Sequence, residues 1–480
     1  MIVGAGLSGL AAGLALVRRG HRVRLLEANA QAGGCCSTED VDGYRFNNGA
    51  MYVAVPRLLD HAFERLGLDR ARVLPLRPIR VPQASVFESG TLIRFGSEGD
   101  SVVEGRDGAS RTAVLRAELE CCVRKWVPVL RTFADDLMPH PPSAARLLAK
   151  AWRHLPKLAG TLSTEIRRNF TDPEVRAAVS AVTLYTGLAP ERTPIFQIMG
   201  LAAMLDEGFF LPEGGMGAIT RVLEHAFVAA GGELSLSTPV RALRAQAGRI
   251  GSVVLEDGRQ LLGDAVLSTA SAMTTFECLL AAGSVPARIR RKLRKLPLSH
   301  RALGIQLGLR NRILPAAYAT NHVPSMEQQH RLLVPQPSGV RWFSFTTPTI
   351  DLPELAPDGG SVVEMFAAVD PAHPLDEWND RLAREQAHSA IDALSRHHAL
   401  DIATCRIVTP RDYERRMHLF DGALYGLSPG ASPTAQFAHE TPVPGLFQAG
   451  QTTHPGYGVG PAMWSGILAA EAMARFVEKP

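Results

Sequence analysis

The sequence predicts an α/β protein, and its two ends carry that prediction. The chain opens with a short apolar strand, Met1–Val3, that runs directly into a Gly-x-Gly-x-x-Gly pattern and a helical stretch over Leu10–Arg19. It closes with a strand over Gly445–Gly450, a glycine-rich turn over Thr453–Gly460 and a helix over Ala462–Val477. Strand-turn-helix units of this kind are typical of doubly wound, Rossmann-type folds.

The N-terminal glycines stand at the spacing of a dinucleotide-binding fingerprint. Gly4 allows the tight turn after the strand, Gly6 lets the backbone approach a pyrophosphate, and Gly9 lets the helix pack against the strand. A second strand, Val23–Leu26, ends in the acidic Glu27, which is suited to accept hydrogen bonds from a ribose. The free N–H groups and the positive dipole end of the helix favour phosphate at this turn.

The rest of the chain contains strands, a helical block and a return to α/β structure. Short strands are expected near Ser85–Phe87 and over Leu92–Phe95, followed by helices through residues 108–205 that prolines 139, 141 and 142 interrupt. The later segments are a turn over Phe210–Gly217, a helix over Ala218–Ala230, a strand over Glu233–Ser237, and a hairpin that pairs Ile250–Leu255 with Gln260–Leu267 across Asp257–Gly258.

Bulk properties exclude several classes of protein. A formal net charge of +4 over 480 residues is small, and no basic stripe with interleaved aromatic residues suggests nucleic-acid binding. The six cysteines form neither a CxxC pair nor a secreted framework, which favours a reducing compartment, and we expect no metal site. Apolar runs of about 18 residues are lacking, and no positive charge precedes the apolar N-terminus, so we expect neither a transmembrane helix nor a signal peptide but a cytoplasmic protein.

The helical block is basic, and two interpretations of it stay open. Residues 111–170 hold eleven Lys/Arg against five Asp/Glu, an excess of six positive charges. One interpretation is an interfacial amphipathic surface that places the protein peripherally on the inner membrane face, with Trp126, Trp152, Leu155 and Leu158 as its apolar side chains. The other is an ordinary solvated face. A second basic run, Arg288–Lys295, fits either one.

Four motifs, in this order, resemble the two-dinucleotide-binding-domain flavoproteins. Within that superfamily, the chain is most similar to the carotenoid desaturase (phytoene desaturase), carotenoid isomerase and retinol saturase group. The motifs are the N-terminal fingerprint with Glu27; Gly33-Gly34-Cys35-Cys36-Ser37-Thr38 followed by Asp42–Gly49; Leu211–Gly217 leading to Gly231–Leu234; and Leu446–Gly456. The chain departs from the common pattern in three ways: Cys35 replaces a frequent Arg, Gln451 replaces a frequent Asp, and an Asp that is common near Asn47 or Asn48 is missing.

The resemblance implies a discontinuous FAD-binding domain. Its expected segments are residues 1–55, 206–274 and 441–480, with a mixed-sheet substrate domain over 56–107 and 275–440 and a helical subdomain over 108–205. The residues expected to contact FAD are Gly4, Gly6, Gly9, Glu27, Ala28, Gly33, Gly34, Cys35, Val240, Gly450, Gln451, Gly458 and Val459. No second glycine fingerprint follows a strand, so a dedicated NAD(P)H domain is not expected, and electrons would be exchanged with quinone, oxygen or a carrier protein.

Tyr52, His454 and Tyr457 are the candidate catalytic residues, expected to face the substrate beside the flavin. His454 has two interpretations: a proton shuttle, because imidazole titrates near neutrality, or a structural histidine bonded to its loop. The resemblance favours desaturation of a long, apolar polyene or isoprenoid substrate by hydride transfer to flavin N5. Three alternatives stay open: saturation or cis–trans isomerisation with reduced flavin, tailoring of another lipid or polyketide chain, and a non-catalytic prenyl-lipid carrier like the GDP dissociation inhibitors.

Overall fold

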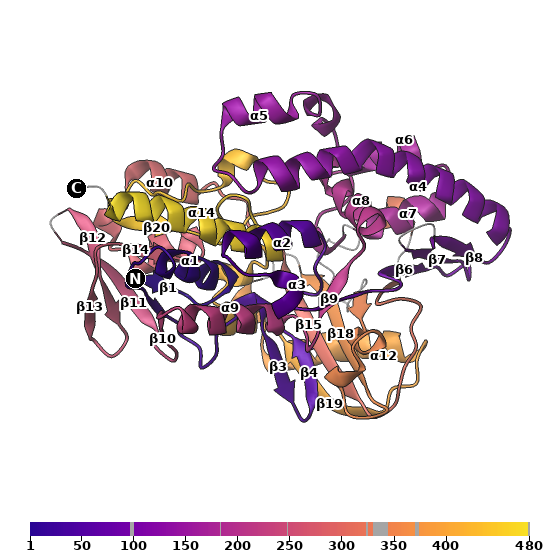
Figure 1. The fold of residues 1–480 in the computed structure, drawn as a ribbon. Coiled ribbons are helices and arrows are strands. Elements are labelled where there is room, and N and C mark those ends of the chain that lie inside the picture. Colours follow the sequence, from indigo (N-terminus) through magenta and orange to yellow (C-terminus); the bar gives the residue numbers. More distant parts are fainter. Residues whose placement is uncertain are drawn as a thin grey trace.

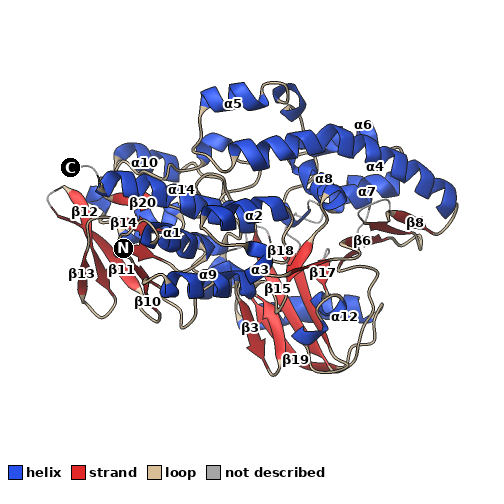
Figure 2. Ribbon diagram, in the orientation of Figure 1, coloured by secondary structure: helices blue, strands red, loops and turns tan. Residues whose placement is uncertain are grey.

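Two large sheets organise the molecule, and a helical segment lies across them (Figure 1). The computed structural model describes residues 1–96, 100–182, 184–246, 248–322, 325–329, 344–369 and 374–478. One sheet has five strands and the other has eight, and smaller two- and three-stranded sheets accompany them. Figure 2 shows the strands gathered in two regions, with helices between and above them.

Strands and helices alternate at both ends of the chain, whereas the middle is mainly helical. The helices are α1 (Leu7–Val17), α2 (Pro56–Arg65), α3 (Arg70–Val73), α4 (Gly108–Arg131), α5 (Ala144–Ala151), α6 (Leu162–Asn169), α7 (Pro173–Ala181), α8 (Met199–Asp206), α9 (Gly217–Ala229), α10 (Ala287–Leu293), α11 (Met326–Gln329), α12 (Asp380–Ser395), α13 (Pro410–Met417) and α14 (Val459–Val477). The strands are β1 (Ile2–Val3), β2 (Arg24–Leu26), β3 (Thr38–Val41), β4 (Tyr44–Asn47), β5 (Leu76–Pro78), β6 (Gln83–Val86), β7 (Leu92–Phe95), β8 (Val102–Glu104), β9 (Phe210–Pro212), β10 (Glu233–Ser235), β11 (Val240–Gln246), β12 (Arg249–Leu255), β13 (Gln260–Leu262), β14 (Val266–Ser268), β15 (Arg301–Leu309), β16 (Ala319–His322), β17 (Ser344–Thr346), β18 (Ser361–Val369), β19 (Ile402–Val408) and β20 (Leu446–Gln448).

The five-stranded sheet confirms the predicted Rossmann-type unit. Its order is β10-β2-β1-β14-β20, and every neighbouring pair is parallel. The strands come from the start, the middle and the end of the chain, so this sheet is discontinuous in sequence. Helix α1 packs between α9 and α14, and its apolar side chains Leu10 and Leu14 are fully buried in the shared core.

The eight-stranded sheet is mixed, with the order β19-β15-β18-β17-β16-β6-β7-β8. Its neighbouring strands are antiparallel except for the parallel pair β16 and β6. Alternate residues of its central strands point to one face and pack against α12, forming a separate apolar core. The members of this face include Leu303, Ile305, Leu307, Leu309, Phe345, Val363, Met365 and Ala367.

Two local predictions for the middle of the chain were wrong. The predicted turn at Phe210 begins with a strand, β9, which pairs with β5. The predicted second hairpin arm, Gln260–Leu267, is two strands: β13 pairs with β12, whereas β14 joins the parallel sheet between β1 and β20. All three residues of β14 are buried, which is the pattern of a central parallel strand and not of an exposed hairpin arm.

The helical block forms as predicted, but Trp126 does not lie on its surface. Trp126 is fully buried on α4, and its indole N–H donates to Glu165 Oε1 at 2.8 Å, while Lys125 Nζ lies 2.6 Å from the same oxygen. Leu158 is also partly buried against the core. A membrane-facing role for Trp126 is therefore wrong, whereas such a role for Leu158 stays a prediction. Within the described residues, no helix combines the length and apolarity that crossing a bilayer requires.

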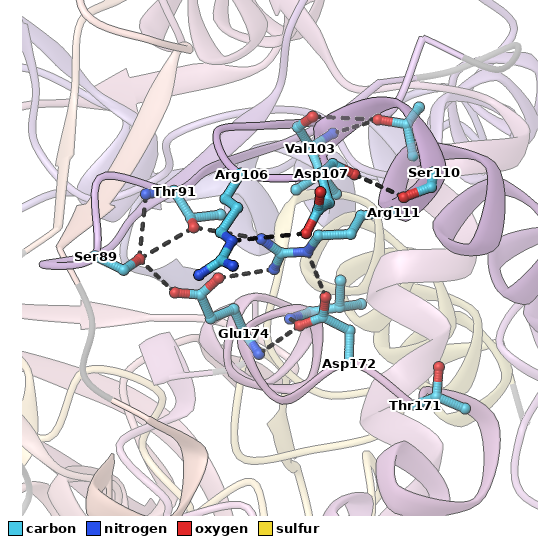
Figure 3. Close-up of polar contacts among 12 residues, drawn as sticks. Ser89, Thr91, Val103, Arg106, Asp107, Ser110, Arg111, Thr171, Asp172 and Glu174 are labelled. Carbon is cyan, nitrogen blue, oxygen red and sulfur yellow. Dashed lines mark hydrogen bonds and ion pairs between the residues drawn. The ribbon is translucent and has the colours of Figure 1, made fainter.

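Ion pairs join two helices of the helical block, and a hydrogen bond links them to the eight-stranded sheet (Figure 3). At the start of α4, Arg111 donates to Asp172 at 2.6 Å and to Glu174 at 2.7 Å, at the start of α7. Ser89, in the β6–β7 turn, donates to the same Glu174 carboxylate. Burial alone would raise the pKa of both carboxyl groups, but hydrogen bonds and the Arg111 charge hold each pKa below its ordinary value.

Replacing Arg111 should weaken the native fold. Arg111→Met leaves two half-buried carboxylates without their shared partner, so the free energy of unfolding should fall by about 1–3 kcal/mol at neutral pH. A carboxyl whose pKa is depressed by folding stabilises the native state above its ordinary pKa and loses that effect as pH falls through the native value. The gap between wild type and variant, measured by urea denaturation, should therefore narrow in acid.

The matched control is Arg106→Met, because Arg106 is 95% exposed and lies 3.8 Å from a similarly solvated Asp107. An exposed pair of this kind contributes little, so the control should unfold like wild type. Equal losses in both variants, or a gap that does not depend on pH, would contradict the assigned role.

Candidate active site

The fingerprint glycines take the positions that the sequence predicted. Gly4 has φ +98°, and a Cβ added there would lie 2.4 Å from Thr269 Oγ1. A Cβ on Gly9 would lie 1.9 Å from the Gly4 carbonyl oxygen, so only glycine permits this contact between α1 and β1. Gly6, at the N-terminus of α1, faces open space, because a Cβ added there would have no atom within 4 Å. That space lies where a pyrophosphate would approach the backbone.

Glu27 joins the end of β2 to the fingerprint turn. Its buried carboxylate accepts from Ala5 N–H at 2.7 Å and from Asn29 N–H at 2.9 Å. A carboxylate has about four acceptor sites, so a ribose hydroxyl can still donate to it. Thr238 N–H donates to the Glu27 carbonyl at 2.7 Å, which brings the start of β11, with Val240, next to Glu27 and the half-buried Ala28.

The second glycine motif folds back onto the first. Gly33 N–H donates to the Ala5 carbonyl at 2.9 Å, and a Cβ on Gly34 would lie 3.5 Å from Gly6 Cα. Both glycines have positive φ, of +128° and +54°, so the turn suits residues without a side chain. Burial raises the pKa of the following thiol, Cys35, to about 11, and this cysteine is therefore a protonated, unpaired thiol at neutral pH.

The C-terminal motif brings a second helix start beside the first. Helix α14 begins at Val459, directly after Gly458 with φ +105°. Ser8 Oγ of α1 donates to the Ala462 carbonyl at 2.6 Å, so α1 and α14 pack with their first turns in contact. In the described structure no side chain caps either helix start. Two uncapped helix starts beside open space around Gly6 fit a dinucleotide, because their N–H groups can donate to its phosphates and to a flavin carbonyl.

The end of strand β20, before α14, is also crowded. Contacts there explain why Gln451 replaces the frequent Asp. Gly450 has φ +106°, and a Cβ there would meet the Thr269 carbonyl oxygen at 3.1 Å. The next side chain, Gln451, is oriented so that its amide donates to the Leu424 carbonyl and accepts from Gly426 N–H, each at 3.2 Å. A carboxylate has no donor, so an aspartate could not make both bonds. Gln451 thereby links the flavin-binding motif to the loop that carries Tyr425.

Aromatic rings gather beside the α14 start. Tyr457 lies against Tyr425, with ring centroids 4.6 Å apart, and its hydroxyl accepts from Gln197 Nε2 at 3.1 Å. Tyr52 stacks on Phe209 at 4.2 Å with an interplanar angle of 10°. Burial, with a smaller effect of the Tyr457 hydroxyl, raises the pKa of Tyr52 to about 12. The structure therefore brings two of the three candidate catalytic residues together, each as a neutral phenol.

We call Tyr52, Phe209, Tyr425 and Tyr457 the aromatic wall. Further aromatic side chains extend it toward the eight-stranded sheet. His300 lies 5.6 Å from Tyr425 and 5.8 Å from Phe366, measured between ring centroids, and Tyr185 lies 5.8 Å from Phe366. Burial lowers the pKa of His300 to about 4, so its ring is neutral. Sequence patterns did not indicate these residues or Tyr425, because they belong to segments without a recognisable motif. Their aromatic character was the one available signal.

His454 faces a different neighbour. Burial lowers its pKa, an effect that the backbone carbonyls of Leu137, His140 and Met138 oppose. Its imidazole therefore lies near residues 137–140, but among the described residues its Nε2 atom has no hydrogen-bond partner. Tyr457, three residues further on, lies against Tyr425. Both interpretations of His454, the proton shuttle and the structural histidine, stay predictions.

The segment 47–52, which carries Tyr52, is bonded to the eight-stranded sheet. Glu364 Oε1 accepts from Asn47 N–H at 2.6 Å, and Gln306 Nε2 donates to the Asn47 carbonyl at 3.1 Å. At the other end of the segment, the Tyr318 hydroxyl donates to the Met51 carbonyl at 2.5 Å. These bonds fix the segment between the two sheets.

Asn47 also binds through its side chain. Asn47 Oδ1 accepts from Met216 N–H and from Thr38 Oγ1, each at 2.9 Å, so it joins the second and third sequence motifs. Glu364 accepts a further bond, from Thr346 Oγ1 at 3.2 Å. Burial raises the pKa of Glu364 from 4.5 to about 7, although these donors act in the opposite direction.

Alanine at position 6 should separate folding from cofactor binding. Because nothing lies within 4 Å of a Cβ at Gly6, Gly6→Ala should fold like wild type, yet its methyl group would block backbone approach to the pyrophosphate. We expect purified Gly6→Ala to lack the yellow flavin colour while its thermal unfolding matches that of apo wild type. Gly283→Ala, also in open space, is the control and should bind FAD normally. Full flavin content in Gly6→Ala would contradict the assignment.

Neutralising Glu364 should change how stability depends on pH. A carboxyl whose pKa is raised by folding stabilises the native state below its ordinary pKa, and this effect is lost as pH rises through the native value of about 7. Relative to wild type, Glu364→Gln should therefore gain stability between about pH 5 and pH 8, by roughly 3 kcal/mol at most. Thermal unfolding across this range checks it, with exposed Glu256→Gln as the flat control. If the stabilities of Glu364→Gln and wild type differed by the same amount at every pH in this range, the raised pKa of the buried carboxyl would be contradicted.

Comparison with known proteins places this site in a family. The model of the family described as flavin containing amine oxidoreductase matches residues 7–474. A zeta-carotene-forming phytoene desaturase of Myxococcus xanthus is 25% identical over 499 residues, covering 98% of this chain and 93% of that protein. A phytoene dehydrogenase of Streptomyces griseus is 27% identical over 501 residues, covering 98% and 94%.

Solved structures agree on the fold. Cyclohexylamine oxidase from Brevibacterium oxydans IH-35A has a TM-score of 0.60 to this structure at 16% identity, and the match covers 99% of this chain and 98% of that one. At this identity the likeness concerns the fold alone. The family match spans nearly the whole chain and includes both uncapped helix starts of the site. The chain therefore belongs to the flavin containing amine oxidoreductase family and is an FAD-dependent oxidoreductase of the carotenoid desaturase-like group.

Proposed function

We propose that this enzyme desaturates a long, apolar polyene or isoprenoid substrate of the carotenoid kind. The observation that carries the proposal is the aromatic wall formed by Tyr52, Phe209, Tyr425 and Tyr457 beside the start of α14. Flat aromatic faces suit a flat conjugated chain, and burial raises the pKa of Tyr52 to about 12, so its phenol is neutral at neutral pH. Full-length similarity to proteins named as phytoene desaturases supports the same substrate class.

The residues of this chain hold, orient and shield the reactants. The thirteen residues predicted above to contact FAD would hold it near the open space at Gly6 and the α14 start, and FAD when bound would supply the hydride acceptor, its N5 atom. The tyrosine faces stabilise positive charge that develops on the substrate carbon as the hydride leaves. The adjacent carbon then loses a proton to water, because that proton is acidic by this stage and requires no strong base; loss of the hydride and the proton leaves one new C=C bond. Quinone or oxygen would take up the two electrons.

Different parts of the chain have separate roles in this function. Residues 1–55, 206–274 and 441–480 would bind FAD, residues 56–107 and 275–440 would bind substrate, and residues 108–205 would cover it. Support for the second assignment comes from the eight-stranded sheet, which joins β6, β7 and β8 to strands β15–β19 from far along the chain.

Expression in a host that accumulates acyclic polyenes tests the function. An active desaturase should lengthen the conjugated system, so extracted pigment should absorb at longer wavelength and lose two hydrogens per new double bond by mass. The flavin-free variant Gly6→Ala should leave the pigment unchanged. An unaltered polyene pool with flavin-replete wild-type protein would contradict the proposal.

His454 gives a sharper prediction within the same function. Because its imidazole lies near residues 137–140, His454→Ala should fold, retain FAD and lose activity by about tenfold to a hundredfold through misplacement of the loop. Tyr457→Phe, which removes only the hydroxyl that Gln197 binds, is the companion variant. Both are assayed by the initial rate of flavin bleaching with polyene. Complete loss in His454→Ala at full flavin content would show proton chemistry and favour the saturase or isomerase alternatives.

We propose further that α5 docks peripherally on an anionic membrane. On α5 and the turn after it, Leu148 is 59% exposed and Trp152 is 56% exposed, with Leu147 and Leu155 beside them. Figure 1 shows α5 outside α4, at the top of the molecule. Basic side chains accompany this apolar surface, namely Arg146, Lys150, Arg153 and Lys157. Exposed leucine and tryptophan among Lys and Arg suit the headgroup region of a bilayer, and this location would favour uptake of an apolar substrate.

Liposome flotation checks this surface. Wild type should float with vesicles that contain anionic lipid at low salt, and the bound fraction should fall as salt screens the basic residues. Leu148→Ser combined with Trp152→Ser should abolish flotation without loss of flavin. Leu262→Ser, which alters a similarly exposed leucine on β13, should float like wild type. Absence of wild-type binding at low salt would favour a solvated face.

A further inference from the structure

The eight-stranded sheet has a second face, and this face is buried yet polar. Along β18, Glu364 and Phe366 point away from α12, toward segment 47–52 and Tyr185. Strand register continues the same face across the sheet: Phe366 pairs with Ser344, Ser344 with Asn321, and Asn321 with Ser85. The face that borders the aromatic wall is therefore continuous as far as β6.

Three polar side chains lie together at the β16–β6 end of this face. Ser85 and Gln83 are alternate residues of β6, and Asn321 is the register partner of Ser85 on β16. Neighbouring strands lie about 4.8 Å apart and alternate residues about 7 Å apart, so the three groups share one small area. We call Gln83, Ser85 and Asn321 the polar trio.

The polar trio is buried without full hydrogen bonding. Gln83 is 3% exposed, and Ser85 and Asn321 are fully buried. Among the described residues, Gln83 Nε2, Ser85 Oγ and Asn321 Oδ1 have no partner, although Asn321 Nδ2 donates to the Ala84 carbonyl at 3.4 Å. Leaving a buried donor or acceptor unpaired costs free energy comparable to a lost hydrogen bond. Three such atoms side by side indicate that something polar completes them.

We infer that the substrate carries a hydroxyl group, bound by the polar trio; this rests on the proposed function and specifies its substrate class. A hydroxyl is both donor and acceptor, which matches the acceptor Asn321 Oδ1, the donor Gln83 Nε2 and the hydroxyl of Ser85. Strand β6 lies three strands from β18, whose Glu364 holds Asn47, a span of about 14 Å. The hydroxyl would therefore lie about 14 Å from the place where β18 holds segment 47–52, which carries Tyr52.

Competition between two probes tests the inference on the FAD-loaded enzyme. The probes are an acyclic polyene hydrocarbon and the same polyene bearing a terminal hydroxyl, and the readout is kcat/KM from flavin bleaching. Wild type should prefer the hydroxylated polyene by about tenfold or more, because a site built to bind a hydroxyl rejects the analogue that lacks it. Ser85→Ala and Asn321→Leu should each reduce this preference by about tenfold.

The control is Thr320→Val, on the same strand as Asn321 but on the face toward α12, where Thr320 is the register partner of Phe345. It should leave the preference intact. Equal use of both polyenes by wild type, or a preference that survives Ser85→Ala and Asn321→Leu, would overturn the inference and show that water alone fills the site. In either case the proposed function would stand, whereas failure of both polyenes to bleach the flavin would overturn the proposed function and this inference with it.

Discussion

The molecule depends on how segment 47–52 is held between its two sheets. The backbone of Asn47 donates its N–H to Glu364 and its carbonyl accepts from Gln306, and Tyr318 binds the Met51 carbonyl. A buried backbone group without a partner is costly, so the eight-stranded sheet can sit in only one way on this segment. Tyr52 thereby keeps a fixed place beside the α14 start. Hydrogen bonds to the second sequence motif therefore position the proposed substrate side of the enzyme. The same motif also packs against the fingerprint.

A second constraint is the close packing of helices on the five-stranded sheet. The contacts of Gly9 with the Gly4 carbonyl, and of Gly466 with the Ser8 carbonyl, leave no space for a side chain. They bring the first turns of α1 and α14 together, so two positive helix ends lie side by side, an arrangement that suits the phosphates of a dinucleotide. The same glycines therefore permit the close helix packing and the arrangement that we propose for FAD binding. Tyr457, in the aromatic wall, directly precedes the start of α14, so the proposed substrate side lies next to the proposed cofactor site.

The parts that were predictable from sequence are those whose chemistry is local. Gly4, Gly6, Gly9 and the terminal helix follow from steric rules, and the structure agrees with each of them. Glu364 and the polar trio could not be recognised, because their role depends on strand register between segments far apart in the sequence. Tyr425 lies in a turn without a motif, and only its ring contacts with Tyr457 and His300 mark it. The predictions for strand β14 and for Trp126 were wrong for a related reason. A short apolar run, or a tryptophan in a basic helix, does not reveal its tertiary neighbours. The domain boundaries and the role of His454 stay predictions.

The central claim is that electrons pass from the substrate to the flavin, because desaturation, saturation and isomerisation can share this site and differ in electron flow. An anaerobic single turnover of oxidised, FAD-loaded enzyme with one equivalent of acyclic polyene measures it directly. Desaturation predicts loss of flavin absorbance near about 450 nm in step with a product that has one additional double bond, with two electrons recovered per flavin. Product formation without bleaching would indicate isomerisation, and turnover that requires pre-reduced flavin would indicate saturation; either result would contradict the account.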